Sequence, residues 1–521
     1  MPIEPRVWLL AGSLVICPVA VAAEDAPPLS AIDWLSQSVT TPASAVVPGE
    51  TASGRTEPPV ADGGALPEPV ATTALDGPSP DAAGLISTAV SGLPRKLWGA
   101  GLTHEIAERL TWEKVESLPA LRQLFLTILL AEVDAPVDAG GKGDLLRVRI
   151  DTLLGLGALE QAAALIEVAG EMTPELFRRS FDVALLTGQE DRACEAMQSA
   201  PDLAPTLQAR IFCLARSGDW DTAALTLHSA DALDQLSDDQ ATLLARFLDP
   251  DLFEGEAPPA PPSPVTPLDW KMFEAIGEPL ATDGLPLAFS YADISPQTGW
   301  KAQIEAAERL TRAGTIPPNV ILGLYTEREA AASGGVWDRV DAFQAFDAAM
   351  ASRDPARIAA TLPEVWARMQ EVELEVPFAV LYGKALMTME LPSEAGRIAF
   401  RVSLLSPQYE IAAQRHKPVD STEAFLIAVA KGDLKTATPP DNLGRAILQA
   451  FVSPAPSTEA KALIDGNRTG EAILVAIDNI QRGVQGDLRG VTEGLSLLRG
   501  VRLESVARRT ALELMILERR G

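Results

Sequence analysis

The sequence predicts an all-α fold, a solenoid of stacked helical hairpins preceded by a signal peptide and a disordered Pro/Ala-rich segment. Apolar residues in the body recur at helical intervals, as at Leu121, Leu124 and Ile128. Strand-like alternation is nearly absent, and Ala, Leu, Glu and Arg are frequent while aromatic residues make up only 5%. Glycine turns also recur at intervals that suit a pair of helices.

Residues 1–23 have the three parts of a secretory signal peptide: a charged start with Arg6, an apolar run over 7–21 and small residues before Glu24. Cleavage is expected before Ala23 or Glu24. A membrane anchor is the first alternative, but the run is shorter than the roughly 20 residues that a bilayer core requires. A lipoprotein acylated at Cys17 is the second, but the bulky Ile16 stands where such signals carry a small residue. No later segment is long enough to span a membrane, so we expect a soluble, exported, periplasmic or otherwise extracytoplasmic protein.

Residues 24–91 are predicted to be a mostly disordered tether, because Pro, Ala, Ser, Thr and Gly dominate and cannot bury enough apolar surface. Two islands interrupt it: a short amphipathic one at 29–39, and a second at 82–93 that runs into the folded body. In the first, Ile32 and Leu35 fall on one face of a helix that Ser30 opens, with Trp34 beside them. These three residues are candidates for docking, either as a strap on this protein's own helices or on another protein.

The body is divided by a Pro-rich stretch at 257–267, which is expected to be a linker or a crossing loop. It separates an N-terminal helical-repeat region, 92–256, from a C-terminal one, 268–521. A recurring turn appears in both, with a Gly followed five residues later by an Ala. Its copies are Gly157 and Ala162, Gly188 and Ala193, Gly218 and Ala223, and Gly432 and Ala437.

The physical reason for this pattern is that Gly takes the left-handed conformation that ends one helix, while a small Ala lets the next helix pack closely. The first three glycines stand 31 and 30 positions apart, within the period range of helical arrays. The turn from Gly218 through Trp220 to Ala223 resembles the tetratricopeptide repeat, in which an aromatic residue follows the Gly by two positions. The resemblance covers roughly half of the chain and implies a concave surface that binds peptides or proteins, without chemistry. It departs from the family seven positions before the Gly, where a bulky residue such as Phe181 replaces a small one.

Removal of the signal peptide would leave two cysteines, Cys194 and Cys213, in a compartment that permits disulfides. They are predicted to pair, because one lies early on the second helix of a hairpin and the other late on the first helix of the next. The two thiols and the three histidines, His104, His228 and His416, show none of the short paired spacings of zinc or haem sites. No metal or cofactor is therefore expected.

The chain carries 71 acidic and 43 basic residues, a net charge of -28, which argues against a nucleic-acid partner. No nucleophile elbow, Ser-x-x-Lys pair or dinucleotide fingerprint stands in a usable context. We therefore expect a non-catalytic, exported protein-binding or scaffolding solenoid, such as an assembly factor that contacts an unidentified protein of the cell envelope.

The alternative is an envelope glycosidase or lyase on a helical scaffold, since such an enzyme needs only two carboxylates that meet in space. Glu305 with Glu308 and Asp338 with Asp341 are examples of such pairs. Close by, Arg339 is expected to pair with a neighbour, or else to floor a small pocket.

Overall fold

The computed structural model describes residues 79–112, 118–170 and 172–517, and these ranges contain helices and loops without a named strand. The predicted all-α class is confirmed. Among these residues the one extended pairing is an isolated parallel bridge between Ile86 and Ala131. The predicted signal peptide at 1–23, the tether as far as residue 78 and the island at 29–39 with Ile32, Trp34 and Leu35 lie outside the described residues.

Residues 79–91 belong to the folded body, so the mostly disordered tether predicted over 24–91 is ordered at its C-terminal end, where the second island at 82–93 runs into the body. This segment forms η1 (Pro80–Ala82) and α2 (Thr88–Ser91). The side chains of Leu85 and Ile86 are buried, and both amides donate to the carbonyl of Leu130 at the end of α4 (Pro119–Leu130). This short apolar run thus gains its cover from α4, a helix further along the chain.

Arg149 holds this segment in place from α5 (Asp144–Gly155), which packs beside α3 (Thr103–Trp112). Its guanidinium is 1% exposed and donates four hydrogen bonds to main-chain oxygens. The acceptors are the carbonyls of Leu129 at 2.7 Å, Ala131 at 3.1 Å, Ala83 at 2.7 Å and Asp81 at 3.2 Å. Burial lowers the pKa of Arg149 to about 10, which leaves it charged at neutral pH.

Three successive helix pairs follow, and the predicted glycine turns join the two helices of each. The helices are α5, α6 (Leu159–Ala169), α7 (Pro174–Thr187), α8 (Glu190–Ser199), α9 (Leu207–Arg216) and α10 (Trp220–Ala232), with η2 (Pro201–Leu203) between α8 and α9. All three glycines have positive φ, with values of 73°, 71° and 85° for Gly157, Gly188 and Gly218. The alanines five positions on, Ala162, Ala193 and Ala223, are buried. The turns thus have the geometry that glycine permits and the close packing that alanine permits.

The aromatic residue of the third turn, Trp220, is the first residue of α10, where the side chain of Asp219 caps the helix by accepting from Thr222. Its side chain is half exposed, and its ring lies 6.5 Å from that of Phe247 on α11 (Asp238–Leu248). Phe181, the bulky residue before the second turn, is 2% exposed and belongs to the core.

The fourth predicted turn is only half realised. Gly432 has a φ of 71° and ends α21 (Ser421–Lys431), as expected. The prediction that a helix packs at Ala437 is wrong, because α22 (Asn442–Val452) begins only after the side-chain cap of Asp441. Two prolines, Pro439 and Pro440, lie between them and disfavour helical geometry in the residues before them.

The predicted disulfide between Cys194 and Cys213 is present, with 5.0 Å between the two Cα atoms. Cys194 lies early on α8 and Cys213 late on α9, and the two helices pack against each other. Both side chains are buried in the core of the region from α7 to α12. The bridge therefore ties the second helix pair to the third.

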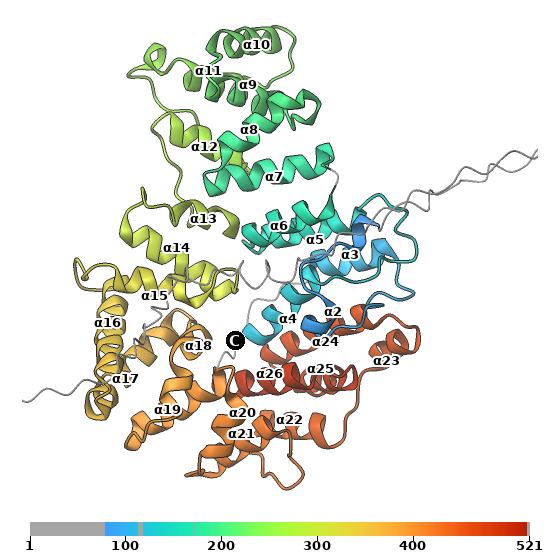
Figure 1. The fold of residues 1–521 in the computed structure, drawn as a ribbon, viewed down its shortest axis with the longest axis vertical. Coiled ribbons are helices and arrows are strands. Elements are labelled where there is room, and N and C mark those ends of the chain that lie inside the picture. The colour runs from blue at the N-terminus through green and yellow to red at the C-terminus, as the bar shows by residue number, and fades with distance from the viewer. Residues whose placement is uncertain (1–78, 113–117, 171, 518–521) are drawn as a thin grey trace, which may run out of the picture.

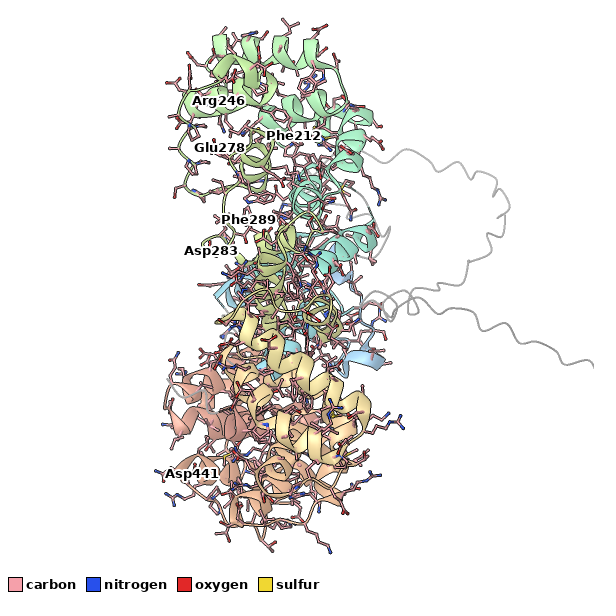
Figure 2. The ribbon with its side chains drawn as sticks, turned by 90° about the vertical axis from the view of Figure 1, so that its left-hand side faces the viewer. Phe212, Arg246, Glu278, Asp283, Phe289 and Asp441 are labelled. Carbon is pink, nitrogen blue, oxygen red and sulfur yellow. A yellow bond between two sulfur atoms is a disulfide. The ribbon has the colours of Figure 1, made fainter. Side chains whose placement is uncertain are left out.

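Of the two roles predicted for the Pro-rich stretch at 257–267, a linker or a crossing loop, the structure shows the crossing loop, so the body is not divided at this point. The stretch follows η3 (Pro250–Phe253) and runs irregularly into α12 (Pro267–Ala275). Met272 and Phe273 of α12 lie in the same core cluster as Phe181 and Phe212, and α12 contacts both α7 and α11. The apolar face of α12 finds its cover on helices before the prolines, so this stretch crosses one packing unit. Figure 2 shows Phe212 and Arg246 of this packing unit near one end of the long axis, far from Asp441.

The remaining helices curl back toward the N-terminal ones (Figure 1). They are η4 (Leu287–Phe289), α13 (Ser290–Asp293), α14 (Trp300–Ala313), α15 (Pro318–Thr326), α16 (Val336–Ser352), α17 (Pro355–Glu371), α18 (Glu375–Leu386), α19 (Ser393–Leu405), α20 (Tyr409–Arg415), α21, α22, α23 (Thr458–Asp465), α24 (Thr469–Val484), α25 (Leu488–Gly500) and α26 (Glu504–Ile516). α26 packs on α4, and α24 contacts both α3 and α4. This half of the body is therefore closed on itself and does not continue as an open solenoid.

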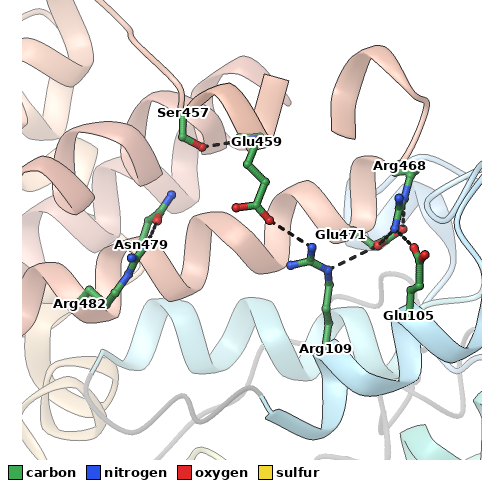
Figure 3. A network of polar contacts seen from close by, with 9 residues as sticks. Glu105, Arg109, Ser457, Glu459, Arg468, Glu471, Asn479 and Arg482 are labelled. Carbon is green, nitrogen blue, oxygen red and sulfur yellow. Dashed lines mark hydrogen bonds and ion pairs between the residues drawn. The ribbon is translucent and has the colours of Figure 1, made fainter. Parts of the chain in front are cut away.

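An ionic network sits at this closure, between α3 and α24 (Figure 3). Glu471 of α24 is fully buried and forms ion pairs with Arg468 and, at 3.5 Å, with Arg109 of α3. Arg468 also pairs with Glu105, and Arg109 lies 3.2 Å from Glu459. The charge of Glu471 is thus compensated inside the contact, as a buried carboxylate requires. None of the helices that the structure describes is both long and apolar enough to cross a bilayer.

A candidate peptide-binding groove between α18 and α21

A groove of about 1020 Å³ lies among the ends of α18, α19, α20 and α21. Its shape comes from two proline-containing connections: 387–392, which ends with Pro392 before α19, and 416–420, which contains Pro418 before α21. Proline cannot continue the preceding helix, so both connections leave the helical layer and form the walls. We call this the basic groove, for the charges described below.

One wall is held rigid by His416 and Glu423. The Nε2 atom of His416 lies 2.8 Å from Oε2 of Glu423, and the amide of Val419 donates to the same oxygen at 3.0 Å. The imidazole stacks on the ring of Phe400, with 3.7 Å between centroids and an interplanar angle of 11°. Asp420 caps α21 by accepting from the amide of Glu423 at 2.8 Å. These contacts fix the connection 416–420 as a wall of the groove.

The hydroxyl of Ser403 and the imidazole of His416, both in the lining, are bonded within the fold. Ser403, which is 1% exposed, donates its hydroxyl hydrogen to the carbonyl of Ala399 at 2.7 Å. His416 uses Nε2 for Glu423. A nucleophile requires a base within hydrogen-bond reach, and these two groups have other partners.

The rim of the groove is positively charged. Arg397 of α19, Arg415 of α20 and Lys417 are all exposed and line the groove. No hydrogen bond or ion pair joins their side chains to another residue of the described ranges. The acidic residues of the lining are Glu423, which His416 engages, and Glu390. Apolar groups lie between the charges, among them Met389 and the strongly exposed Val419, at 69%.

Of the carboxylates nominated from the sequence, Glu305, Glu308 and Asp338 have structural partners in the fold. Glu308 is 4% exposed and accepts from Arg339 at 2.8 and 2.7 Å and from the hydroxyl of Tyr325 at 2.6 Å. Burial, reinforced by the charge of Glu308, raises the pKa of Tyr325. Arg339 thus pairs with a neighbour, as the first of its two expected roles requires. Glu305 lies 3.6 Å from Lys301.

Of the second pair, Asp338 accepts from the amide of Gly334 at 2.8 Å, and Asp341 is exposed. Across the described ranges, no three histidine, cysteine or acidic side chains gather as metal ligands would.

Comparison of the chain with protein-family models, with curated proteins and with solved structures gives no match. The groove must therefore be interpreted from its own chemistry. The basic run Arg415-His416-Lys417 is visible in the sequence directly before Pro418, but the groove is not. Arg397 and Phe400 join it only through the packing of α19 on α20.

Proposed function

We propose that the protein is a non-catalytic, exported binding protein whose basic groove holds an acidic, partly apolar segment of another envelope protein. The observation that carries this proposal is the set of three exposed cations, Arg397, Arg415 and Lys417, that lack ionic partners among the described residues. In a chain with a net charge of -28, unpaired cations around one groove favour an acidic occupant.

The apolar part of the lining determines what else the occupant carries. Phe400 and Met389 offer apolar surface between the charges, and Val419 is exposed at the rim. Aromatic and methionine side chains are frequent at protein interfaces, since they bury much area and adapt their shape. An extended segment with acidic residues on either side of one or two apolar ones complements this surface.

The compartment is part of the proposal. The Cys194–Cys213 disulfide supports export, because disulfides persist in oxidising compartments and are rare in the cytosol. The predicted signal peptide at 1–23 agrees with it. The partner is then expected among periplasmic or surface proteins.

Site-specific photo-crosslinking tests the proposal in the cell. A photoreactive amino acid replaces Val419 at the groove rim, and in the matched control it replaces Leu225 on α10, which is equally exposed at 68%. We expect a protein to be crosslinked from position 419 and not from 225, and its crosslinked segment to be acidic. Equal capture from both positions, or a basic segment, would contradict the proposal.

A synthetic peptide of the mapped segment then gives the affinity. Three exposed ion pairs contribute about 0.2–1 kcal/mol each, so their loss weakens binding roughly 3- to 150-fold. The variant Arg397→Gln/Arg415→Gln/Lys417→Gln should show this loss at low salt, and the difference should shrink as salt screens the charges. The control Arg192→Gln/Arg210→Gln/Arg357→Gln removes three exposed cations elsewhere. Equal affinities of the two variants would refute the role of the groove.

A further inference from the structure

A second groove, of about 280 Å³, lies at the centre of the closed half of the body, between α4, the α14–α15 connection and the start of α18. We call it the central groove. Its walls are mainly apolar, with Leu126 and Leu130 from α4, Ile316 from the connection and Val380 from α18. Val380 is 44% exposed although its neighbours in the groove are apolar. Such a surface is typical of a site that another segment covers.

Two buried polar atoms of the central groove lack partners. Oγ1 of Thr311 and Oε1 of Gln161 are inaccessible to solvent and form no hydrogen bond within the described residues. Thr311 as a whole is only 3% exposed. Because both atoms are closed to solvent, a segment that lies in the groove does not contact them, and the choice of occupant depends on the apolar wall and the charges of the groove.

The described chain starts next to this groove. Ile86 lines it and is joined through residues 79–85 to the segment that precedes Ser79. The amphipathic island at 29–39 is separated from Ser79 by 39 residues, 40–78. A linker of that length has a root-mean-square end-to-end distance of about 35 Å by polymer scaling, which is long enough for the island to reach the groove. The effective concentration of a segment tethered in this way is high compared with that of a free partner.

The composition of the island matches the lining. Ile32, Trp34 and Leu35 supply apolar side chains, and Asp33 is the single charged residue of 29–39. The groove presents Arg509, whose side chain has no hydrogen bond or ion pair within the described residues. A carboxylate beside an apolar cluster therefore meets an arginine beside an apolar wall.

We propose that the central groove is the docking site of this chain's own segment 29–39, with Ile32, Trp34 and Leu35 against the apolar wall and Asp33 toward Arg509. The docking is independent of the basic groove, which stays open for a partner. It makes the segment a strap that covers the junction of α4, α14 and α18.

Disulfide trapping tests the docking directly. A chain that starts at Glu24 contains only Cys194 and Cys213, which are already paired, so two introduced cysteines are its only free thiols. Ser36→Cys, one helical turn after Ile32, is combined with Val380→Cys in the central groove. The matched control combines Ser36→Cys with Val419→Cys at the rim of the basic groove. We expect the intrachain disulfide between positions 36 and 380 to form at least tenfold faster than the one between positions 36 and 419. Equal rates, or a bond between two chains at Val380, would overturn the proposal.

A second measurement follows the environment of Trp34 by its ¹⁹F chemical shift, without crosslinking. The chain is labelled with 5-fluorotryptophan, and the ¹⁹F resonance of Trp34 is identified by its loss in Trp34→Phe. We expect a resonance distinct from that of the urea-unfolded chain, and we expect Val380→Glu to move it to the unfolded position while Val419→Glu leaves it unchanged. A Trp34 resonance at the unfolded position in the parent chain would refute the docking.

Discussion

Replacement of Arg149 by Met tests how the chain before α3 is held to the body. The guanidinium donates to four carbonyl oxygens, of which those of Asp81 and Ala83 belong to the N-terminal segment and those of Leu129 and Ala131 to α4 and its end. Met fills a similar volume but donates no hydrogen bond. The four carbonyls then stay in a dry site without this donor.

The magnitude follows from the burial and the bonds. Hydrogen bonds from a charged donor contribute about 1.5–3 kcal/mol each, and an acceptor left unpaired in a buried site costs about 1–3 kcal/mol. The variant recovers the cost of desolvating the charge, which offsets part of this loss. With four neutral carbonyls left without this donor, the net cost is about 3–5 kcal/mol, below the sum of the four bonds. Because Arg149 joins the segment to the body, the loss should appear as local opening of 79–91.

Hydrogen exchange with mass spectrometry measures this opening. The amides of Leu85 and Ile86, which donate to Leu130, should exchange on the order of 100- to 5000-fold faster in Arg149→Met. The control is Arg179→Met, which removes an arginine that pairs with the half-exposed Asp151, and its effect should stay below about 1 kcal/mol. A change of less than threefold at Leu85 and Ile86 would refute the anchoring role of Arg149.

Three further predictions concern stability. The double variant Cys194→Ser/Cys213→Ser should lower the free energy of unfolding by about 3 kcal/mol, because the bridge closes a short loop. Reductant should lower the melting temperature of the parent but not of the variant, and a parent insensitive to reductant contradicts this. Gly218→Val should lower the free energy of unfolding by more than about 1 kcal/mol, because its φ of 85° is strained for valine. Gly157→Val should lower it further, because an added Cβ would also lie 3.0 Å from leucine atoms. Melting temperatures equal to the parent's would contradict both predictions. Burial raises the pKa of Asp182 from 3.8 to about 6, so the folded state holds a proton that the unfolded state releases between pH 4 and 6. In urea unfolding, the free energy of unfolding of Asp182→Asn should therefore equal that of the parent near pH 4 and exceed it by ~1–3 kcal/mol above pH 6. A difference between the two proteins that does not change with pH would contradict this explanation.

The helix pairs and the disulfide were predictable because their causes are local. Gly188 and Gly218 end helices through their own backbone conformation, and Asp219 caps α10 from the adjacent position. Once two successive turns are located, the phase of the helices between them places Cys194 and Cys213 on facing sides. The failure at Ala437 has a local cause as well, since the prolines at 439 and 440 outweigh the glycine signal.

The basic groove was predictable only in part. The run Arg415-His416-Lys417 is visible in the sequence, but its partner Arg397 lies on another helix. Glu423 is one of many acidic residues in the sequence, and only its distance of 2.8 Å from His416 distinguishes it. Pairings of this kind depend on how helices pack, for which periodicity carries no information.

The sequence by itself determined the all-α class, the three glycine turns with their buried alanines, and the disulfide, because each depends on backbone propensity or on spacing within one or two helices. The tertiary structure alone decided that residues 79–91 pack on the end of α4, that α12 shares a core with α7 across the prolines, and that α24 and α26 close onto α3 and α4. The reason is that an apolar face specifies that it will be buried but not which of many similar faces buries it. That choice depends on shape complementarity, and on buried groups such as Arg149 and Glu471 that require one particular neighbour.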